Sequence, residues 1–153
     1  MPVKPVPDGY HTVTPYLVIK GAAAALEFYK KAFGAEELLR MPAPDGTIAH
    51  AEIRIGDSTI MMGEEQPGMG FIAAKPGTPA SVGLMLYVTN VDDMWKRALA
   101  AGGRELRPLK DQFYGDRSGT FADPFGHIWT IATHIEDVTP EEMDRRFKAE
   151  MGG

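Results

Sequence analysis

Hydrophobic and polar positions along the chain form a pattern that occurs twice, about 70 residues apart. In the first half, a β-rich run at 12–20 precedes a helical pattern over 22–33, where Leu26, Tyr29 and Phe33 recur at helical spacing. Gly34 supplies a stop for that helix. Alternating or β-rich runs bounded by turn residues then predict three further strands, at 36–41, 48–55 and 59–63.

The second half repeats this order. An apolar strand pattern over 81–89 leads into a helix that Asn90 caps and that stops at Gly102 and Gly103. The local strings also align, with Ile55–Ile60 matching Phe125–Thr130. Three more strands are expected, at 104–109, 118–122 and 128–134. Each half therefore reads as a βαβββ module, and the chain is predicted to be an α+β protein whose two modules surround a concave central site.

The segments outside the modules complete the predicted organisation. Prolines in the first residues indicate an extended tail, and three prolines and three glycines between the halves indicate a linker or lid loop. Thr139 and Pro140 favour the start of a C-terminal helix. The expected units are a tail at 1–11, the first module at 12–66, the loop at 67–80, the second module at 81–137 and the helix at 138–153.

Composition narrows the class of protein. The 153 residues carry a net charge of −5, and lysine and arginine are scattered, which is unlike a nucleic-acid-binding protein. There is no cysteine, hence no disulfide, thiolate metal site or cysteine nucleophile. The start of the chain does not resemble a signal peptide, and no apolar run approaches the length of a membrane span. We therefore expect a cytoplasmic protein without membrane or nucleic-acid partners.

Five local strings, in this order and spacing, resemble the vicinal-oxygen-chelate superfamily of glyoxalases, extradiol dioxygenases and bleomycin-resistance proteins, and within it the PhnB-like branch. The strings are Val13–Leu17, Leu26–Gly34, His50–Asp57, Tyr114–Gly119 and Asp123–Trp129. The resemblance covers residues 12–137. It implies a glyoxalase/bleomycin-resistance-type fold, a small-molecule ligand in the concave site and a homodimer. The cavity could lie within one chain or between two.

The resemblance also implies where a divalent metal would be bound, by one side chain from the first and one from the last strand of each module. Those positions fall near Tyr16 and His50 in the first module and near Gly83 and Thr130 in the second. Of these only His50 is a typical ligand. We therefore expect no metal or other cofactor, although a divalent metal bound by His50 and Glu52 remains an alternative.

His50 and Glu52 are the candidate catalytic residues. Two positions apart on a predicted strand, they point to the same face. They could form a base and an acid, or half of a metal site, inside the cavity. The alternative is a polar pair on the solvent face of a half-exposed strand.

Further candidates for ligand binding come from both modules. Tyr16, Met85 and Tyr87 lie on the opening strands, where they could line an apolar pocket or belong to the core. Thr130 shares a face of the last strand with His134, whereas Trp129 is expected in the core.

The turn before the seventh strand supplies two more candidates, Tyr114 and Arg117. The guanidinium of Arg117 could hold an anionic or carbonyl group of a ligand. Alternatively, Arg117 and Asp116 form a surface ion pair of little energetic value.

Together these features predict a glyoxalase/bleomycin-resistance-like protein that binds a small, largely apolar or aromatic ligand in a pocket lacking most of the usual metal ligands. One alternative is a metal-dependent lyase, isomerase or dioxygenase with a non-standard site around His50 and Glu52. Another is a dimeric scaffold with no ligand. Whether the protein is an enzyme stays open at this level.

Overall fold

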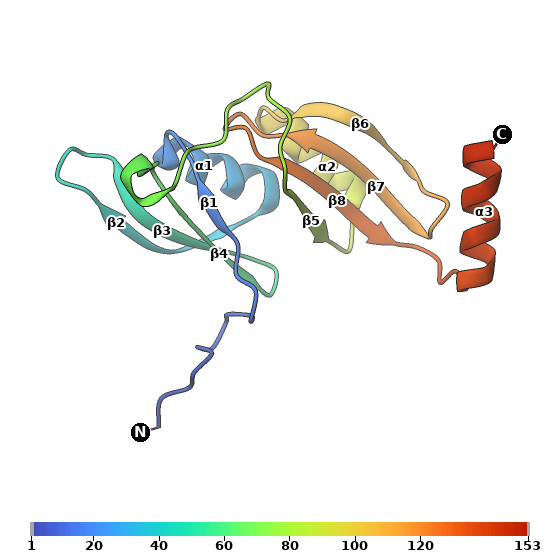
Figure 1. The fold of residues 1–153 in the computed structure, drawn as a ribbon, viewed down its shortest axis with the longest axis horizontal. Helices are drawn as coiled ribbons and strands as arrows, with labels where there is room; N and C mark the ends of the chain where they lie inside the picture. Colours follow the sequence, from blue (N-terminus) through green and yellow to red (C-terminus); the bar gives the residue numbers. More distant parts are fainter. Residues whose placement is uncertain (1, 153) are drawn as a thin grey trace.

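The computed structural model describes residues 2–152 and contains two modules of the same topology (Figure 1). In module 1 the strands lie in the order β1-β4-β3-β2, with β1 parallel to β4 and the other pairs antiparallel. Its elements are β1 (Tyr16–Val18), α1 (Ala22–Phe33), β2 (Glu36–Pro42), β3 (Ile48–Ile55) and β4 (Ser58–Gly63).

Module 2 has the equivalent order β5-β8-β7-β6, again with one parallel pair, β5 and β8. Its elements are β5 (Gly83–Tyr87), α2 (Val91–Ala101), β6 (Arg104–Asp111), β7 (Asp116–Ala122) and β8 (Ile128–His134). The predicted pair of βαβββ modules is therefore confirmed.

Local sequence explains where the helices begin and end. Helix α1 ends where Gly34 adopts a positive φ of 67°, a conformation that glycine reaches without steric cost. Helix α2 begins after Asn90, whose side chain accepts a hydrogen bond from the Asp93 amide, as the sequence predicts. No helix within residues 2–152 is long and apolar enough to cross a membrane.

The core lies on one side of each sheet. Helices α1 and α2 pack against each other behind the strands (Figure 1), and the fully buried Ile53, Phe121, Trp129 and Ile131 point toward them. Aromatic rings join the modules here, since Tyr29 of α1 lies 5.4 Å from Trp129 of β8 between ring centroids. Neither α1 nor α2 covers the opposite side of the sheets, which we call the open face (Figure 1).

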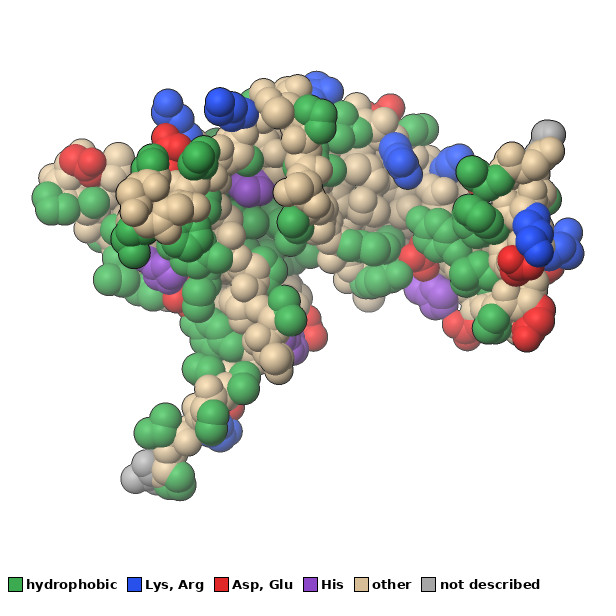
Figure 2. All heavy atoms as spheres, viewed as in Figure 1, with side chains coloured by type: hydrophobic (Ala, Val, Ile, Leu, Met, Phe, Trp, Pro, Cys, Tyr) green, Lys and Arg blue, Asp and Glu red, His purple; other side chains and the backbone are tan. Residues whose placement is uncertain are grey.

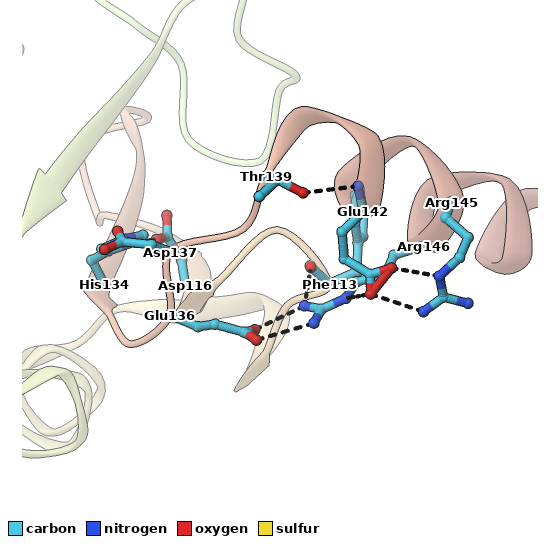
Figure 3. Close-up of polar contacts among 9 residues, drawn as sticks. All are labelled: Phe113, Asp116, His134, Glu136, Asp137, Thr139, Glu142, Arg145 and Arg146. Atoms are coloured by element: carbon cyan, nitrogen blue, oxygen red, sulfur yellow. Dashed lines mark hydrogen bonds and ion pairs between the residues drawn. The ribbon is translucent and has the colours of Figure 1, made fainter.

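Three segments lie outside the modules: the N-terminal tail, the connection between the modules and a C-terminal helix. The connection contains a short 3-10 helix, η1 (Pro67–Met69), and an isolated bridge between Gln66 and Phe71. Helix α3 (Pro140–Gly152) stands at the end of the molecule beyond β6 and β7 and has no buried residue (Figure 1). Arg146 attaches it to the body by donating hydrogen bonds to the Phe113 carbonyl and to Glu136 (Figure 3).

Candidate functional site

The open face of module 1 presents polar side chains beside apolar ones. The strand register places Leu39, Glu52, Met61 and Tyr16 in one row across β2, β3, β4 and β1. His50 lies two residues from Glu52 on β3 and shares its face. The strand therefore presents the predicted pair to the open face.

A chain of hydrogen bonds connects four of these side chains. Glu52 is only 6% exposed and accepts hydrogen bonds from the Tyr10 hydroxyl and from Nε2 of His50, the latter at 2.8 Å. Because an ionised carboxylate can only accept, Nε2 carries the hydrogen, and in the neutral form of the ring Nδ1 is an acceptor. The Tyr16 hydroxyl lies 3.4 Å from that Nδ1. Glu52 thus orients His50, and His50 presents its acceptor to the half-exposed Tyr16.

The same contacts determine the ionisation of the group. Burial disfavours the charged form of Glu52, but the hydrogen bonds from Tyr10 and His50 outweigh it and lower the pKa of Glu52 below its ordinary value. The pKa of Tyr10 is raised, chiefly because its hydroxyl donates to Glu52. At neutral pH Glu52 is therefore a carboxylate and Tyr10 a protonated phenol.

Exposed apolar side chains border this network. Tyr16 is 43% exposed and Met41, which pairs with His50 across the strands, is 50% exposed. In module 2, Met85 and Tyr87 are also exposed on the open face of β5. Hydrophobic side chains are visible over both sheets on the face shown in Figure 2. Contiguous exposed apolar surface often marks a site that binds a ligand or another protein.

The open face of module 2 is mostly polar. The register places Met85, Thr130, Thr120 and Arg107 in one row across β5, β8, β7 and β6. Thr130 therefore lies on the face that the alternation predicts, and its hydroxyl is 2.8 Å from that of Thr120. Trp129 is buried on the other side, as predicted.

At the end of this face, His134 lies between two carboxylates (Figure 3). Its Nδ1 is 2.8 Å from Asp116 and its Nε2 is 2.7 Å from Asp137. The buried Asp116 also accepts a hydrogen bond from the Tyr87 hydroxyl at 2.7 Å. These contacts raise the pKa of His134, with Asp116 the larger cause, and raise the pKa of Tyr87 through its hydrogen bond to Asp116.

The structure does not bring Arg117 to the open face. Its neighbours Asp116 and Ser118 pair with His134 and Ala132, so Arg117 points to the helix side of β7. There it forms ion pairs with Asp92 at 2.9 Å and Asp111 at 3.0 Å, not with Asp116. Because its guanidinium is already paired with these two carboxylates, Arg117 does not serve the predicted ligand-binding role on the open face.

The remaining candidate, Tyr114, lies in the β6–β7 turn with its ring against Phe113. Together with Thr130 it lines a hollow of about 390 Å³ between the open face of module 2 and α3. Met85, Tyr87 and His134 line a separate hollow of about 1080 Å³ beside β5. The predicted ligand-binding residues thus lie in three places. Tyr16 and His50 lie on the open face of module 1, and Met85, Tyr87 and Thr130 lie on that of module 2, with Tyr114 nearby. Arg117 lies on the helix side, apart from both.

The donors present do not fit the four-ligand metal site that the fold family implies. His50 lies on β3, not on the last strand of its module, where Met61 occupies the position paired with Tyr16. The equivalent pair in module 2 is Met85 and Thr130. Within residues 2–152 there is no group of three or more histidine, aspartate or glutamate side chains that could hold a metal ion.

The string alignment of the two halves is one residue out of register at this point. It matches Ile60 with Thr130, but Ile60 is buried toward α1 and Thr130 faces the open side. Met61 shares the open face with Thr130 because side chains alternate along a strand.

Two residues that matter in the structure were missed by sequence reasoning. Tyr10 belongs to the predicted tail, and no periodicity pairs it with Glu52, which lies 42 residues away. Asp123 lies in the turn between β7 and β8. It is buried and accepts hydrogen bonds from Tyr29 at 2.5 Å and Trp129 at 2.8 Å. An aspartate six residues before a predicted core tryptophan, at the start of the turn that leads into its strand, was the available signal for the second.

Comparison with known proteins agrees with this fold. An uncharacterised protein of Mycobacterium tuberculosis is 40% identical over 146 residues, which cover 92% of this chain and 85% of the relative. The crystal structure of TioX from Micromonospora sp. ML1 is 28% identical with a TM-score of 0.63 and covers 82% of this chain and 99% of that one. A glyoxalase-related enzyme from Fulvimarina pelagi is 27% identical with a TM-score of 0.63, covering 80% and 87%.

The family described as the Glyoxalase/Bleomycin resistance protein/Dioxygenase superfamily matches residues 10–131. This range includes module 1, module 2 as far as the middle of β8, and all the side chains of the Tyr10–Glu52–His50–Tyr16 network. The chain therefore belongs to the glyoxalase/bleomycin resistance/dioxygenase superfamily.

Proposed function

We propose that this protein binds a small, largely apolar or aromatic ligand on the open faces of its sheets, with Tyr16 and His50 as the polar anchor. The observation that carries the proposal is the hydrogen-bonded chain Tyr10–Glu52–His50–Tyr16 beside the exposed Met41. Ligand sites typically combine apolar walls with a few precisely oriented polar groups. Glu52 supplies that orientation, since it holds the His50 ring in one tautomer.

The anchor also defines what the site can do chemically. The Nδ1 atom of His50 can accept a proton or hydrogen bond, and a buried carboxylate that holds a histidine is the usual support for a general base. The Tyr16–His50 contact is long at 3.4 Å. A ligand hydroxyl that donates to Nδ1 of His50, or a ligand carbonyl that accepts from the Tyr16 hydroxyl, would form a better hydrogen bond in its place.

A metal-dependent lyase, isomerase or dioxygenase at His50 and Glu52 has less support. Both carboxylate oxygens of Glu52 already accept hydrogen bonds, and the first- and last-strand positions on the open faces hold Tyr16, Met61, Met85 and Thr130. We propose that ligand binding needs no tightly held divalent ion. Elemental analysis of the purified protein tests this, and about one divalent ion per chain would establish the metal-dependent alternative.

We further propose that the protein is a homodimer in which a second copy covers part of the open faces and so closes the ligand cavity. Tyr16, Met41 and Met85 are each about half exposed on these faces, so a second copy that packed there would bury their apolar side chains. Light scattering after size-exclusion chromatography should give twice the chain mass of 16.7 kDa. A monomeric mass would contradict the proposal.

Within the superfamily, we propose that the chain belongs to the PhnB-like branch, because strings such as Leu26–Gly34 and Asp123–Trp129 resemble that branch.

Binding of neutral aromatic probes, such as benzamide and benzyl alcohol, tests the main proposal. They should raise the melting temperature and shift the NMR signals of Tyr16 and His50, and a chelator should change neither result. The H50Q variant should weaken probe binding about tenfold, since it removes the imidazole acceptor. H11Q is the matched control, because His11 is exposed and contacts only the backbone and side chain of Asp57. Equal binding by H50Q and the native chain would contradict the role of His50.

A further inference from the structure

The hollow between the open face of module 2 and helix α3 has a different chemical character from the anchor in module 1. Its volume is about 390 Å³, the size of a small organic molecule. Two cationic side chains, Arg107 and Lys110, line it together with the hydroxyl-bearing Ser118, Thr120 and Thr130. On a chain of net charge −5, this concentration of positive charge is local.

An irregularity in β6 brings both cations to the same face. Arg107 and Lys110 are three positions apart, so a regular strand would point them to opposite sides. The register shifts between them, and Arg107 lies opposite Thr120 while Lys110 lies opposite Ser118. Pro108, which has no amide hydrogen to donate, lies at this bulge on the edge strand. Directly opposed residues share a face, so both cations accompany the hydroxyl groups.

Neither cation is neutralised by a neighbour. Within the described residues 2–152, Arg107 and Lys110 form no ion pair, in contrast to Arg117 on the other side of the same sheet. Glu150 of α3 also lines the hollow, which leaves two positive charges against one negative. The other carboxylate of this face, Asp116, is buried and already engaged by Tyr87 and His134.

The two threonines add a directed hydrogen-bond donor. Their hydroxyl oxygens are 2.8 Å apart, so one hydroxyl donates to the other and a single hydroxyl hydrogen remains to donate elsewhere. The open face of module 2 thus presents a guanidinium, an ammonium and a hydroxyl donor on neighbouring strands. Proteins use these groups to bind oxyanions.

We propose that Arg107, Lys110 and the Thr120–Thr130 pair form a subsite for an oxyanion, so that the ligand of this protein carries a carboxylate, phosphate or phosphonate group. The inference rests on the proposed function, because it assigns a charged group to a small ligand bound on the open face of module 2. It makes the preferred ligand an aromatic or aliphatic acid. The ammonium of Lys110 and the guanidinium of Arg107 hold the anion, and the threonine hydroxyl completes its hydrogen bonds.

Three probes of similar size test the subsite in the full chain: benzoate, phenylphosphonate and the neutral benzamide. NMR titration should show the two anions binding about tenfold or more tightly than benzamide, with shifts at Arg107, Lys110, Thr120 and Thr130. Tighter binding of phenylphosphonate than of benzoate would identify a dianionic group as the natural one, and the reverse order a carboxylate. Raising the ionic strength should weaken the binding of the two anions and leave the binding of benzamide unchanged.

The double variant R107Q/K110Q should remove the preference for anions while keeping benzamide binding. Its matched control is K31Q/K96Q, which removes two positive charges from the helices on the other side of the sheets. If the anions bind no more tightly than benzamide, or if R107Q/K110Q keeps the preference, the oxyanion subsite is wrong and the proposed function stands. If none of the three probes binds and H50Q behaves like the native chain, the proposed function itself fails.

Discussion

Histidine and carboxylate side chains meet in two ways in this protein. His50 donates to Glu52, which is buried and acts as the fixed partner. His134 lies half exposed between Asp116 and Asp137, so protonation would give it two opposite charges at once. The first arrangement keeps one tautomer in place, whereas the second favours the charged form. The same pair of residue types therefore supports hydrogen-bond orientation in module 1 and charge pairing in module 2.

The contacts of His134 with Asp116 and Asp137 predict that the stability of the protein depends on pH. Its pKa in the folded chain is raised above the ordinary value of about 6.5. The folded state therefore binds this proton more tightly than the unfolded state, so its contribution is complete below about pH 6.5 and is lost as the pH rises through the raised pKa. Denaturant unfolding between about pH 6 and pH 8 should show a steeper loss of stability in the native chain than in H134Q. Parallel pH profiles for the two proteins would contradict the prediction.

At the scale of elements, the packing of α2 on its sheet depends on a missing side chain. Trp95 of α2 lies directly over Gly119 of β7, where an added Cβ would be 2.7 Å from the indole ring. The ring is part of the buried core and cannot move away freely. Gly83 of β5, by contrast, has no atom within 4 Å of the position that a Cβ would take. Two strand glycines thus differ completely in what they tolerate.

Alanine at these two positions makes a matched pair. G119A should lower the free energy of unfolding by about 1 to 3 kcal/mol, because overpacking displaces Trp95 or shifts the backbone. G83A should be neutral or stabilise by a few tenths of a kcal/mol, since it only restricts the unfolded chain. Chemical denaturation of both variants measures the difference. Equal stability of the two variants would mean that α2 is not held in the observed position.

Elements also mark the limit of sequence-based reasoning. The helix over 22–33 and the strand over 48–55 were predicted with their observed bounds, because periodicity and glycine stops are local signals. The β6 bulge that turns Arg107 and Lys110 to one face was not predicted, since a bulge depends on pairing with β7. Arg117 shows the same limit: its role depends on which face of β7 it occupies, and on Asp92, which lies 25 residues away.

At the scale of the whole molecule, one buried carboxylate joins the modules. Asp123 accepts hydrogen bonds from Tyr29 of α1 in module 1 and from Trp129 of β8 in module 2. Its other oxygen accepts from the backbone amides of Phe125 and His127. Burial and the neighbouring Asp123 raise the pKa of Tyr29 well above its ordinary value, so the phenol stays protonated as the donor.

Substitution of this carboxylate should weaken the joint between the modules. D123N replaces one acceptor oxygen by an amide NH₂ group, which must face either the Tyr29 and Trp129 donors or the backbone amides of Phe125 and His127. In either orientation, N–H donors that cannot act as acceptors lose their partner. The expected cost is about 2 kcal/mol or more in unfolding free energy, because a buried donor loses its partner. Y29F removes one donor without creating a conflict and should cost about 1 kcal/mol. A smaller loss in D123N than in Y29F, measured by denaturant unfolding, would contradict this account.

Local periodicity and the alternation of side chains along a strand predict the two βαβββ modules, the faces of the last strand and the shared face of His50 and Glu52. The contact of Tyr10 with Glu52, the role of Asp123 between the modules and the position of Arg117 away from the open face appear only in the folded chain. These contacts join residues far apart in the chain or depend on strand register. Neither long-range contacts nor strand register can be read from the spacing of neighbouring residues, so only the folded structure shows them.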